Sequence, residues 1–502
     1  MADTTEQLLP RPKRATGCAS MAQVHAFANL LKTMIGSGLL TLPWATGQFG
    51  LVLSLVGLVY LAYLSQAAIR MMVRCVAFSP LQRKTLVDEL RHTGSLRDSR
   101  RPTAGSHGSQ ASHDDDERLS GVPLSRKSSV VADGHGAGSW QIISVSAGGE
   151  PARIVTIVLL TLAQAGASVS YFDFVCDTMA IYLGTARVFN IFSLWAVLCV
   201  LSLLKQLKSV AWLSAAGLLT YLFVLALVVD FGTQAIDQRG GLSAPPAPKL
   251  VVPAGLGAWF GPALFAFEGM GTALSIYEAM EDADPQPYFA VVSATYAISY
   301  GLYAGVGAFG YVAWGGGVEK VILDSFPHYN TSVGAVHTAD QDLTMAAHLA
   351  LSLILALSFV LQMTPVYHVI EDLLHNPDHS RLPASWWPLT RAAIVGVIAV
   401  VGALVPDMET MISLTGSVAF SAIGFVLPGA FFLLLRPPAT RAPAPPVLTA
   451  AGGGAGEAAF GVELAPPPTR LSDLWDFFVA YLLIVTGVVG GTLGVISTFT
   501  SD

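Results

Sequence analysis

Apolar runs of about twenty residues recur along almost the whole chain, and they constrain its fold more than any other feature. A helix of about twenty apolar residues spans the hydrocarbon core of a bilayer. The chain of 502 residues is 53% hydrophobic and only 12% charged, whereas a soluble protein carries about 25% charged residues. The sequence therefore predicts an all-α, multi-pass membrane protein.

Eleven membrane spans are expected, with the N-terminus in the cytosol. This orientation places most of the 27 lysines and arginines in cytosolic segments, as the positive-inside rule requires. An odd number of spans then leaves the C-terminus in a lumen or outside the cell. The predicted spans are 24–46, 50–73, 152–183, 188–204, 209–231, 254–278, 288–315, 343–370, 389–405, 409–435 and 474–498.

Two long polar segments separate groups of spans. One is rich in Ser, Arg, Asp, His and Gly, and the other in Pro, Ala and Gly. Neither can bury enough apolar surface to fold alone, so both are expected to be disordered and cytosolic. The expected organisation is a disordered tail at 1–23, spans 1–2 at 24–78, a disordered loop at 79–150, spans 3–10 at 151–435, a linker at 436–472, and span 11 with the C-terminus at 473–502.

The polar segments and loops hold candidate modification sites. In "SRKSSV", Arg126 precedes Ser128 and Ser129, which makes these serines candidates for a basophilic kinase, with an unmodified linker as the alternative. Asn330 begins a glycosylation sequon in the loop expected outside the cytosol. The N-terminal "TEQLLP" resembles a dileucine sorting signal except for the position of its Glu6. A vacuolar or lysosomal membrane and the plasma membrane both stay open.

The first span contains residues that interrupt a helix. In "LLKTMIGSGLLTLPW" (30–44), Gly36, Ser37 and Gly38 permit unusual dihedral angles, and Pro43 lacks a backbone donor. Broken membrane helices are tolerated where the freed backbone groups line a cavity or meet a ligand. Close helix packing through small residues is the alternative interpretation.

The sixth span has a matching interruption. "GPALFAFEGMGTAL" (261–274) combines glycines with aromatic residues and includes Glu268. Interrupted helices five spans apart are typical of inverted-repeat transporters of the LeuT type, whose half-helix ends bind cargo and coupling ions near the midplane. Because an acid inside a membrane is costly, Glu268 is predicted either to carry a proton or to hold the break by hydrogen bonding.

Five segments resemble the amino acid/auxin permease family, in particular its proton-coupled and vacuolar amino acid transporters. They are "NLLKTMIGSGLLTLPWA", "LAQAGASVSYFDFVCD", "GPALFAFEGMG", "LALSFVLQMTPVYHVIEDL" and "LVPDMETMISLTGSVAFSAIGFVLPG". The resemblance covers nearly all the predicted spans in order and leaves out the two polar segments. It implies a LeuT-like fold of two inverted five-helix repeats plus one extra helix. It also implies alternating access, and amino acid transport coupled to protons or sodium with no other cofactor.

The resemblance further implies a cargo site between the two interrupted spans. Backbone groups of spans 1 and 6 would hold the cargo, and an aromatic hydroxyl of span 3 would reach its carboxylate. The small residues around the first break favour a small neutral amino acid. The implied cargo-binding residues are Ile35, Gly36, Ser37, Gly38, Tyr171, Phe265, Phe267 and Gly269.

The coupling ion stays open between a proton and sodium. Ser358 in span 8 lies near the hydroxyl position that holds sodium in sodium-coupled relatives. Several proton-coupled relatives have a histidine where this chain has Asn29, and His25 lies about one turn earlier. Together with Glu268, these three residues are the candidates for ion coupling.

Two other classes of protein were weighed. A membrane metalloenzyme would need three zinc ligands close together, and the row of His368, Glu371 and His375 lacks the H-E-x-x-H spacing. Neither an enzyme nor a metal site is therefore expected. A sensor of amino acids would share the fold and signal through the loop 79–150 to a kinase or other signalling partner. No basic tract indicates nucleic acid, so the predicted partners are an amino acid and the lipid bilayer.

Overall fold

The computed structural model of the protein describes residues 21–78, 137–203, 210–241, 248–280, 285–327, 339–375, 386–405, 407–437 and 471–500. Every regular element in these ranges is helical. The candidate phosphorylation sites Ser128 and Ser129 and the candidate glycosylation site Asn330 lie outside the described residues.

Each predicted span overlaps a described helix or pair of half-helices, and eight stretches are long and apolar enough to cross a membrane. The described residues thus form the all-helical, multi-pass arrangement that the sequence predicts. The helices are α1 (Met21–Met34), α2 (Gly38–Phe49), α3 (Leu51–Phe78), α5 (Ala137–Leu183), α6 (Arg187–Ser202), α7 (Val210–Gln238), α8 (Leu256–Ala266), α9 (Met270–Glu278), α10 (Gln286–Trp314), α11 (Ala339–His375), α12 (Trp387–Leu404), α13 (Met408–Thr415), α14 (Leu427–Leu435) and α15 (Leu471–Thr500).

The helix α5 begins earlier than the sequence predicts. Its first turns, from Ala137, lie within the range 79–150 that was expected to be disordered. Trp140 and Ile143 in these turns are 1% and 0% exposed, so this end of the segment has apolar side chains that pack into the bundle. Gly149, with a φ of 68°, then forms a kink before the membrane-crossing part of the helix. The predicted disorder is therefore corrected for residues 137–150.

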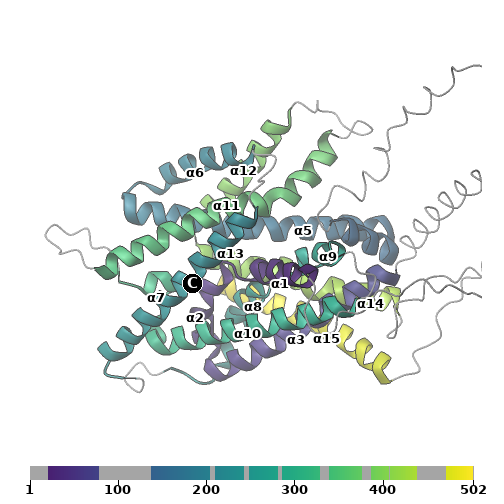
Figure 1. The fold of residues 1–502 in the computed structure, drawn as a ribbon, viewed down its shortest axis with the longest axis horizontal. Coiled ribbons are helices and arrows are strands. Elements are labelled where there is room, and N and C mark those ends of the chain that lie inside the picture. The colour runs from purple at the N-terminus through teal and green to yellow at the C-terminus, as the bar shows by residue number, and fades with distance from the viewer. Residues whose placement is uncertain are drawn as a thin grey trace, which may run out of the picture.

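Two hydrophobic cores divide the bundle. The first joins α1, α2, α3, α8, α10 and α15 with α7 and parts of α5 and α11. Among its buried members are Leu30, Leu42, Leu58, Phe265, Tyr303 and Leu483. The second joins α5, α6, α11 and α12, with Phe172, Leu194, Leu198, Phe359, Val395 and Ile398 among its members. In Figure 1, α1 and α8 lie near the centre of the bundle, and α6 and α12 lie side by side at its margin.

Two arginines, near opposite ends of α12, connect the helices of the second core. Arg187, at the start of α6, pairs with Asp173 of α5 at 3.1 Å and donates to the carbonyl of Gly402 near the end of α12. Arg391, at the other end of α12, pairs with Glu371 of α11 at 2.6 Å. It also donates to the carbonyl of Ser202, the last residue of α6, at 2.8 Å. These contacts favour a rigid four-helix unit.

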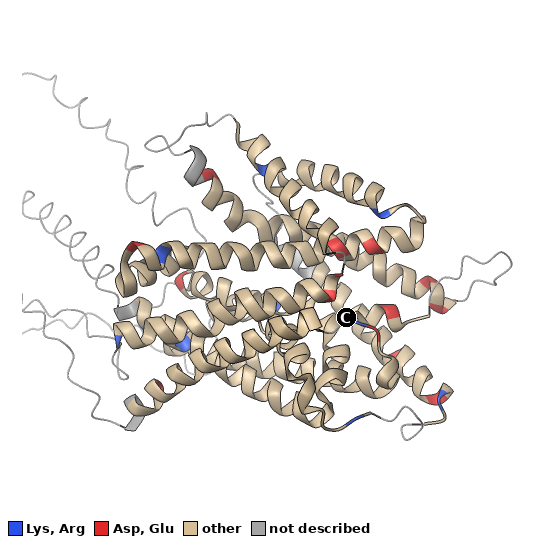
Figure 2. Cartoon of the chain, turned by 180° about the vertical axis from the view of Figure 1, so that it is seen from behind, with Lys and Arg blue, Asp and Glu red and all other residues tan. Residues whose placement is uncertain are grey.

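Most charged residues lie toward the ends of the helices, as Figure 2 shows. Lys320, in the loop between α10 and α11, pairs with Asp407 at 2.5 Å and with Glu409 of α13 at 3.3 Å. Partial burial opposes the charged form of Lys320, but its hydrogen bonds and the two acidic charges outweigh that effect and raise its pKa above the ordinary value. The loop is therefore fastened to α13 by a lysine that stays charged.

The span 408–435 contains two π-helical turns, η6 (Gly416–Phe420) and η7 (Ala422–Val426), between α13 and α14. Single π-helical turns in α-helices are often found at functional sites. Here the widened backbone faces α8 directly: a Cβ on Gly416 would lie 2.7 Å from the carbonyl carbon of Gly261. This span thus packs on the sixth span with no room for a side chain.

We expect Gly416→Ala to destabilise the protein, because the added carbon meets backbone that cannot rotate away. Overpacking of this kind costs about 1–3 kcal/mol of unfolding free energy. Gly424→Ala in the same span is the matched control, since nothing lies within 4 Å of its added carbon. Thermal melting of the purified variants in detergent measures the difference, and equal midpoints would contradict the expected close approach.

Candidate functional site

The first interruption falls where the sequence predicts it. α1 ends at Met34, α2 begins at Gly38, and residues 35–37 are not helical. Leu39 and Leu40 donate to the carbonyls of Gly36 and Ser37, whereas the amides of Gly36, Ser37 and Gly38 have no backbone partner among the described residues. The first turn of α2 therefore presents three free N–H groups at a helix N-terminus, where an anion is stabilised.

The second interruption also falls as predicted. α8 ends at Ala266 and α9 begins at Met270. The amides of Phe267 and Glu268 close the end of α8 by donating to the carbonyls of Leu264 and Phe265, both at 3.1 Å. The carbonyls of Ala266 and Phe267 then point away from the helix that precedes them and are bound by side chains of α10.

The two breaks touch each other through glycines. A Cβ on Gly38 would lie 2.8 Å from Cα of Ala266, and a Cβ on Gly269 would lie 3.3 Å from Cγ of Met34. Small residues therefore serve close packing at Gly38 and Gly269, which was the alternative interpretation of the sequence. Gly36 differs, because only the Tyr171 hydroxyl, at 3.9 Å, comes near its position.

Tyr171 of α5 faces the first break, as the family resemblance implies. Its hydroxyl lies near Gly36, and the neighbouring Ser37 hydroxyl is buried with no hydrogen-bond partner among the described residues. Ser37 is fully buried, and Tyr171 and Gly36 are partly exposed. The Tyr171 hydroxyl thus lies beside Gly36, the first of the three residues whose amides have no backbone partner.

α10 supplies a set of polar groups that the sequence analysis missed. The hydroxyl of Tyr303 lies 2.6 Å from the carbonyl oxygen of Met34 and 2.8 Å from that of Ala266, the last residues of α1 and α8. The hydroxyl of Tyr296 lies 3.5 Å from the Phe267 carbonyl, and that of Ser299 lies 3.7 Å from the Met34 sulfur. Residues 296, 299 and 303 share one helix face, and this spacing of polar residues in an apolar span could have revealed them.

Glu268 lies in the second break and begins the turn before α9. Its carboxylate accepts a hydrogen bond from the backbone amide of Gly271, so it stabilises the N-terminus of α9. Its Oε1 atom has no hydrogen-bond partner among the described residues. The position of a Cβ on Gly271 would be 3.1 Å from this oxygen and 3.2 Å from the Gln164 amide nitrogen. The acid thus faces α5 across a glycine.

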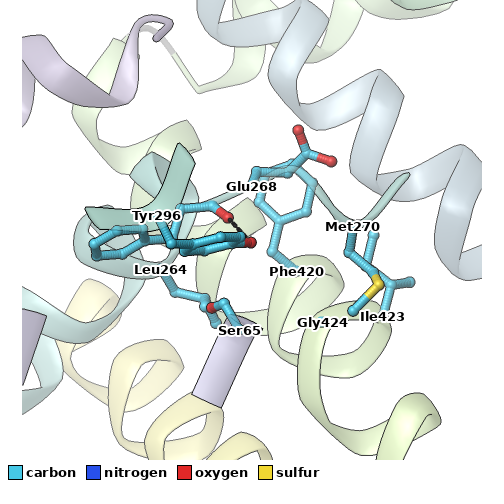
Figure 3. A pocket seen from close by; sticks show the side chains of 9 residues that line it. Ser65, Leu264, Glu268, Met270, Tyr296, Phe420, Ile423 and Gly424 are labelled. Atoms are coloured by element: carbon cyan, nitrogen blue, oxygen red, sulfur yellow. Dashed lines mark hydrogen bonds between the residues drawn. The ribbon is translucent and has the colours of Figure 1, made fainter. Parts of the chain in front are cut away.

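A small pocket, with room for about one water molecule, lies on the other side of the second break. Figure 3 shows Tyr296 and Ser65 on one side of it and Met270, Ile423 and Gly424 on the other, with the Glu268 carboxylate pointing away from Ser65. Residues of α3, α8, α9, α10 and the two π-helical turns line this pocket. Its lining residues are Ser65, Leu264, Phe267, Glu268, Met270, Tyr296, Phe420, Ile423 and Gly424.

The candidates His25 and Asn29 lie apart from the breaks. His25 and Asn29 are exposed on α1, nine and five residues before its end at Met34, or about 14 and 8 Å along the axis at 1.5 Å per residue. Ser358 is partly buried on α11. The structure thus gathers Ile35–Gly38, Tyr171, Phe265, Phe267, Glu268 and Gly269 around the breaks, and not His25 or Asn29.

A helical membrane bundle in which two broken helices meet at the centre is the architecture of a secondary transporter. The chain matches the family described as transmembrane amino acid transporter proteins over residues 20–113 and 118–443, and it belongs to that family. The family and the relatives below are transporters, not enzymes.

Similar proteins agree with this assignment. The chain is 27% identical over 423 residues to amino acid transporter AVT3A of Arabidopsis thaliana, covering 82% of this chain and 81% of that one. It is 26% identical to vacuolar amino acid transporter 4 of Saccharomyces cerevisiae over 47% of this chain and 32% of the yeast protein. A manganese transporter of Eremococcus coleocola, 11% identical, matches 96% of this chain and 88% of its own with a TM-score of 0.51. That likeness shows the shared LeuT-like fold.

We expect Gly38→Ala to affect stability and Gly36→Ala to affect amino acid binding. An added carbon at Gly38 meets the backbone of Ala266 at 2.8 Å, whereas one at Gly36 meets only a hydroxyl at 3.9 Å. We expect Gly38→Ala to lower the unfolding free energy by about 1–3 kcal/mol. Gly36→Ala should leave stability unchanged within about 0.5 kcal/mol and weaken amino acid binding. Thermal melting and radiolabelled ligand binding on the same samples separate the effects; a stable, fully binding Gly38→Ala would contradict the close contact.

Proposed function

We propose that the protein is a secondary active transporter that moves small neutral amino acids by alternating access, coupled to protons. The observation that carries the proposal is the pairing, at the centre of the bundle, of free helix N-terminal amides with helix C-terminal carbonyls. An amino acid backbone has one anionic and one cationic group, and these two kinds of helix end complement them.

The carboxylate of the cargo would bind at the start of α2. The amides of Gly36, Ser37 and Gly38 have no backbone partner in the described chain, and the Tyr171 hydroxyl lies close by. The corresponding start of α9 is different, because the Glu268 carboxylate already accepts from the Gly271 amide. Of the two half-helix N-termini, that of α2 is therefore the one left for an external anion.

The ammonium group of the cargo would lie near the C-termini of α1 and α8, which carry partial negative charge. The Met34 and Ala266 carbonyls accept from Tyr303, and each keeps a second lone pair. The side chain would face Phe265, Phe267 and Ile35, none of which bears charge. The pocket beside the second break is also small, with room for about one water molecule. These features support a small, neutral cargo.

The two hydrophobic cores support alternating access. The four helices α5, α6, α11 and α12 share the second core and are clamped by Arg187 and Arg391. Both broken spans, together with α3 and α10, belong to the first core. Rocking of the first group against this rigid unit would open the site to each side of the membrane in turn.

The relatives bear on the membrane in which the protein resides. One of the relatives is named a vacuolar transporter, which supports placing this protein in a vacuolar membrane. With the N-terminus in the cytosol, a proton gradient out of an acidic lumen would then drive export of the amino acid to the cytosol.

Uptake into proteoliposomes tests the proposed function. Purified protein is offered a panel of radiolabelled amino acids with and without an inward proton gradient, in sodium-free buffer. We expect gradient-stimulated uptake of alanine, serine or similar small neutral amino acids, and none of arginine or glutamate. Binding without uptake under either a proton or a sodium gradient would instead favour an amino acid sensor of the same fold.

Glu268→Gln tests proton coupling at the second break. Glutamine keeps an oxygen that can accept from the Gly271 amide, so the start of α9 should stay intact. It cannot bind and release a proton, so stimulation of uptake by the gradient should disappear while counterflow exchange persists. Glu268→Ala removes both functions and should also lower the melting midpoint. Full gradient stimulation in Glu268→Gln would assign Glu268 a structural role only.

A further inference from the structure

Two helix C-termini converge on one phenol hydroxyl at the centre of the bundle. The Tyr303 oxygen lies 2.6 Å from the carbonyl oxygen of Met34, which ends α1, and 2.8 Å from that of Ala266, which ends α8. Tyr303 is 0% exposed. Because each helix C-terminus carries about half a negative charge, the two carbonyls create a focus of negative potential that bulk water does not screen.

Tyr303 offers a single hydrogen to two carbonyl oxygens. A tyrosine hydroxyl has one hydrogen, and two carbonyl oxygens lie within its hydrogen-bonding distance. The single proton is therefore shared between the ends of two half-helices. Backbone carbonyls and half-helix C-termini at such breaks are also the groups that coordinate monovalent cations in membrane transporters.

We propose that Tyr303 determines the ion requirement of the transporter: its hydroxyl proton fills the place between the Met34 and Ala266 carbonyls that a monovalent cation would otherwise occupy. The partially positive hydrogen of a neutral hydroxyl thereby joins the two breaks, and transport needs no sodium. The inference rests on the proposed function and deepens it, because it concerns the choice of ion at the same breaks.

The packing around Tyr303 allows the hydroxyl to be removed alone. The ring lies edge-to-face against Phe267 with centroids 5.0 Å apart, a contact that phenylalanine would keep. Tyr296→Phe is the matched control. Tyr296 lies on the same helix, is 3% exposed, stacks on the same Phe267 at 6.0 Å, and reaches a single carbonyl at 3.5 Å.

The experiment compares the full-length wild type, Tyr303→Phe and Tyr296→Phe in sodium, lithium and choline chloride at equal ionic strength. Melting midpoints are measured in detergent, and amino acid uptake is measured in proteoliposomes at a fixed proton gradient. All variants are prepared in parallel in sodium and in choline.

We expect the wild type to be indifferent to the cation in both measurements. In choline, Tyr303→Phe should lose about tenfold in uptake, as expected when a buried acceptor loses its donor. Sodium or lithium should restore part of that uptake and raise the melting midpoint of this variant alone. Tyr296→Phe should show no cation dependence, whatever its uptake.

Three results would overturn the inference. They are a sodium-specific rise in the midpoint of the wild type, a Tyr303→Phe midpoint unaffected by every small cation, and failure to recover Tyr303→Phe in either salt. The proposed function fails separately, when the wild type takes up no amino acid at all. A cation-dependent midpoint of Tyr303→Phe would still support the inference in that event.

Discussion

A backbone polar group inside a bilayer must find a partner within the protein, because hydrocarbon offers none. This constraint governs the centre of the molecule, where two membrane helices stop and restart. The C-terminal carbonyls of α1 and α8 are bound by Tyr303, the start of α9 is stabilised by Glu268, and the start of α2 keeps three amides free. The rest of the bundle holds these four helix ends together.

Glycines make that meeting possible, and they do so in two distinct ways. Gly38 and Gly269 let the broken segments approach each other, and Gly261 and Gly416 bring the sixth and tenth spans into backbone contact. Gly36 instead leaves space open beside the Tyr171 hydroxyl. Glycine residues thus allow close packing on most sides of the breaks and leave room on one side, where we propose that the cargo carboxylate binds.

The two hydrophobic cores define the units that would move relative to each other around the site. One core contains both broken spans and also parts of α5 and α11. The other core joins α5 and α11 to α6 and α12, and arginines fasten these four helices at both ends. Tyr171 extends from the second unit toward the first break, so one cargo molecule would contact both units. Such a contact is what allows binding to bias the position of one unit relative to the other.

Much of the site was visible in the sequence, and the reason is local chemistry. Closely spaced glycines weaken a helix locally. The first interruption could therefore be placed at Gly36-Ser37-Gly38, and the second within the stretch 261–274. The role of Tyr303 could not be derived in this way, because it depends on residues 269 and 37 positions away in the chain. The polar helix face formed by Tyr296, Ser299 and Tyr303 can be recognised in the sequence. The carbonyl groups that these side chains bind cannot.

The sequence by itself determined that the chain forms apolar membrane helices, roughly where each begins, and which two are broken, since hydrophobicity and backbone freedom are properties of single residues and their neighbours. Only the tertiary structure decided what the broken ends bind. It showed that Glu268 stabilises a helix start and that His25 and Asn29 lie away from the breaks. It also showed that α5 begins at Ala137, with Trp140 buried and a kink at Gly149. These outcomes depend on which distant groups meet in space, because a freed carbonyl or amide takes whichever partner the packing of the whole bundle brings to it.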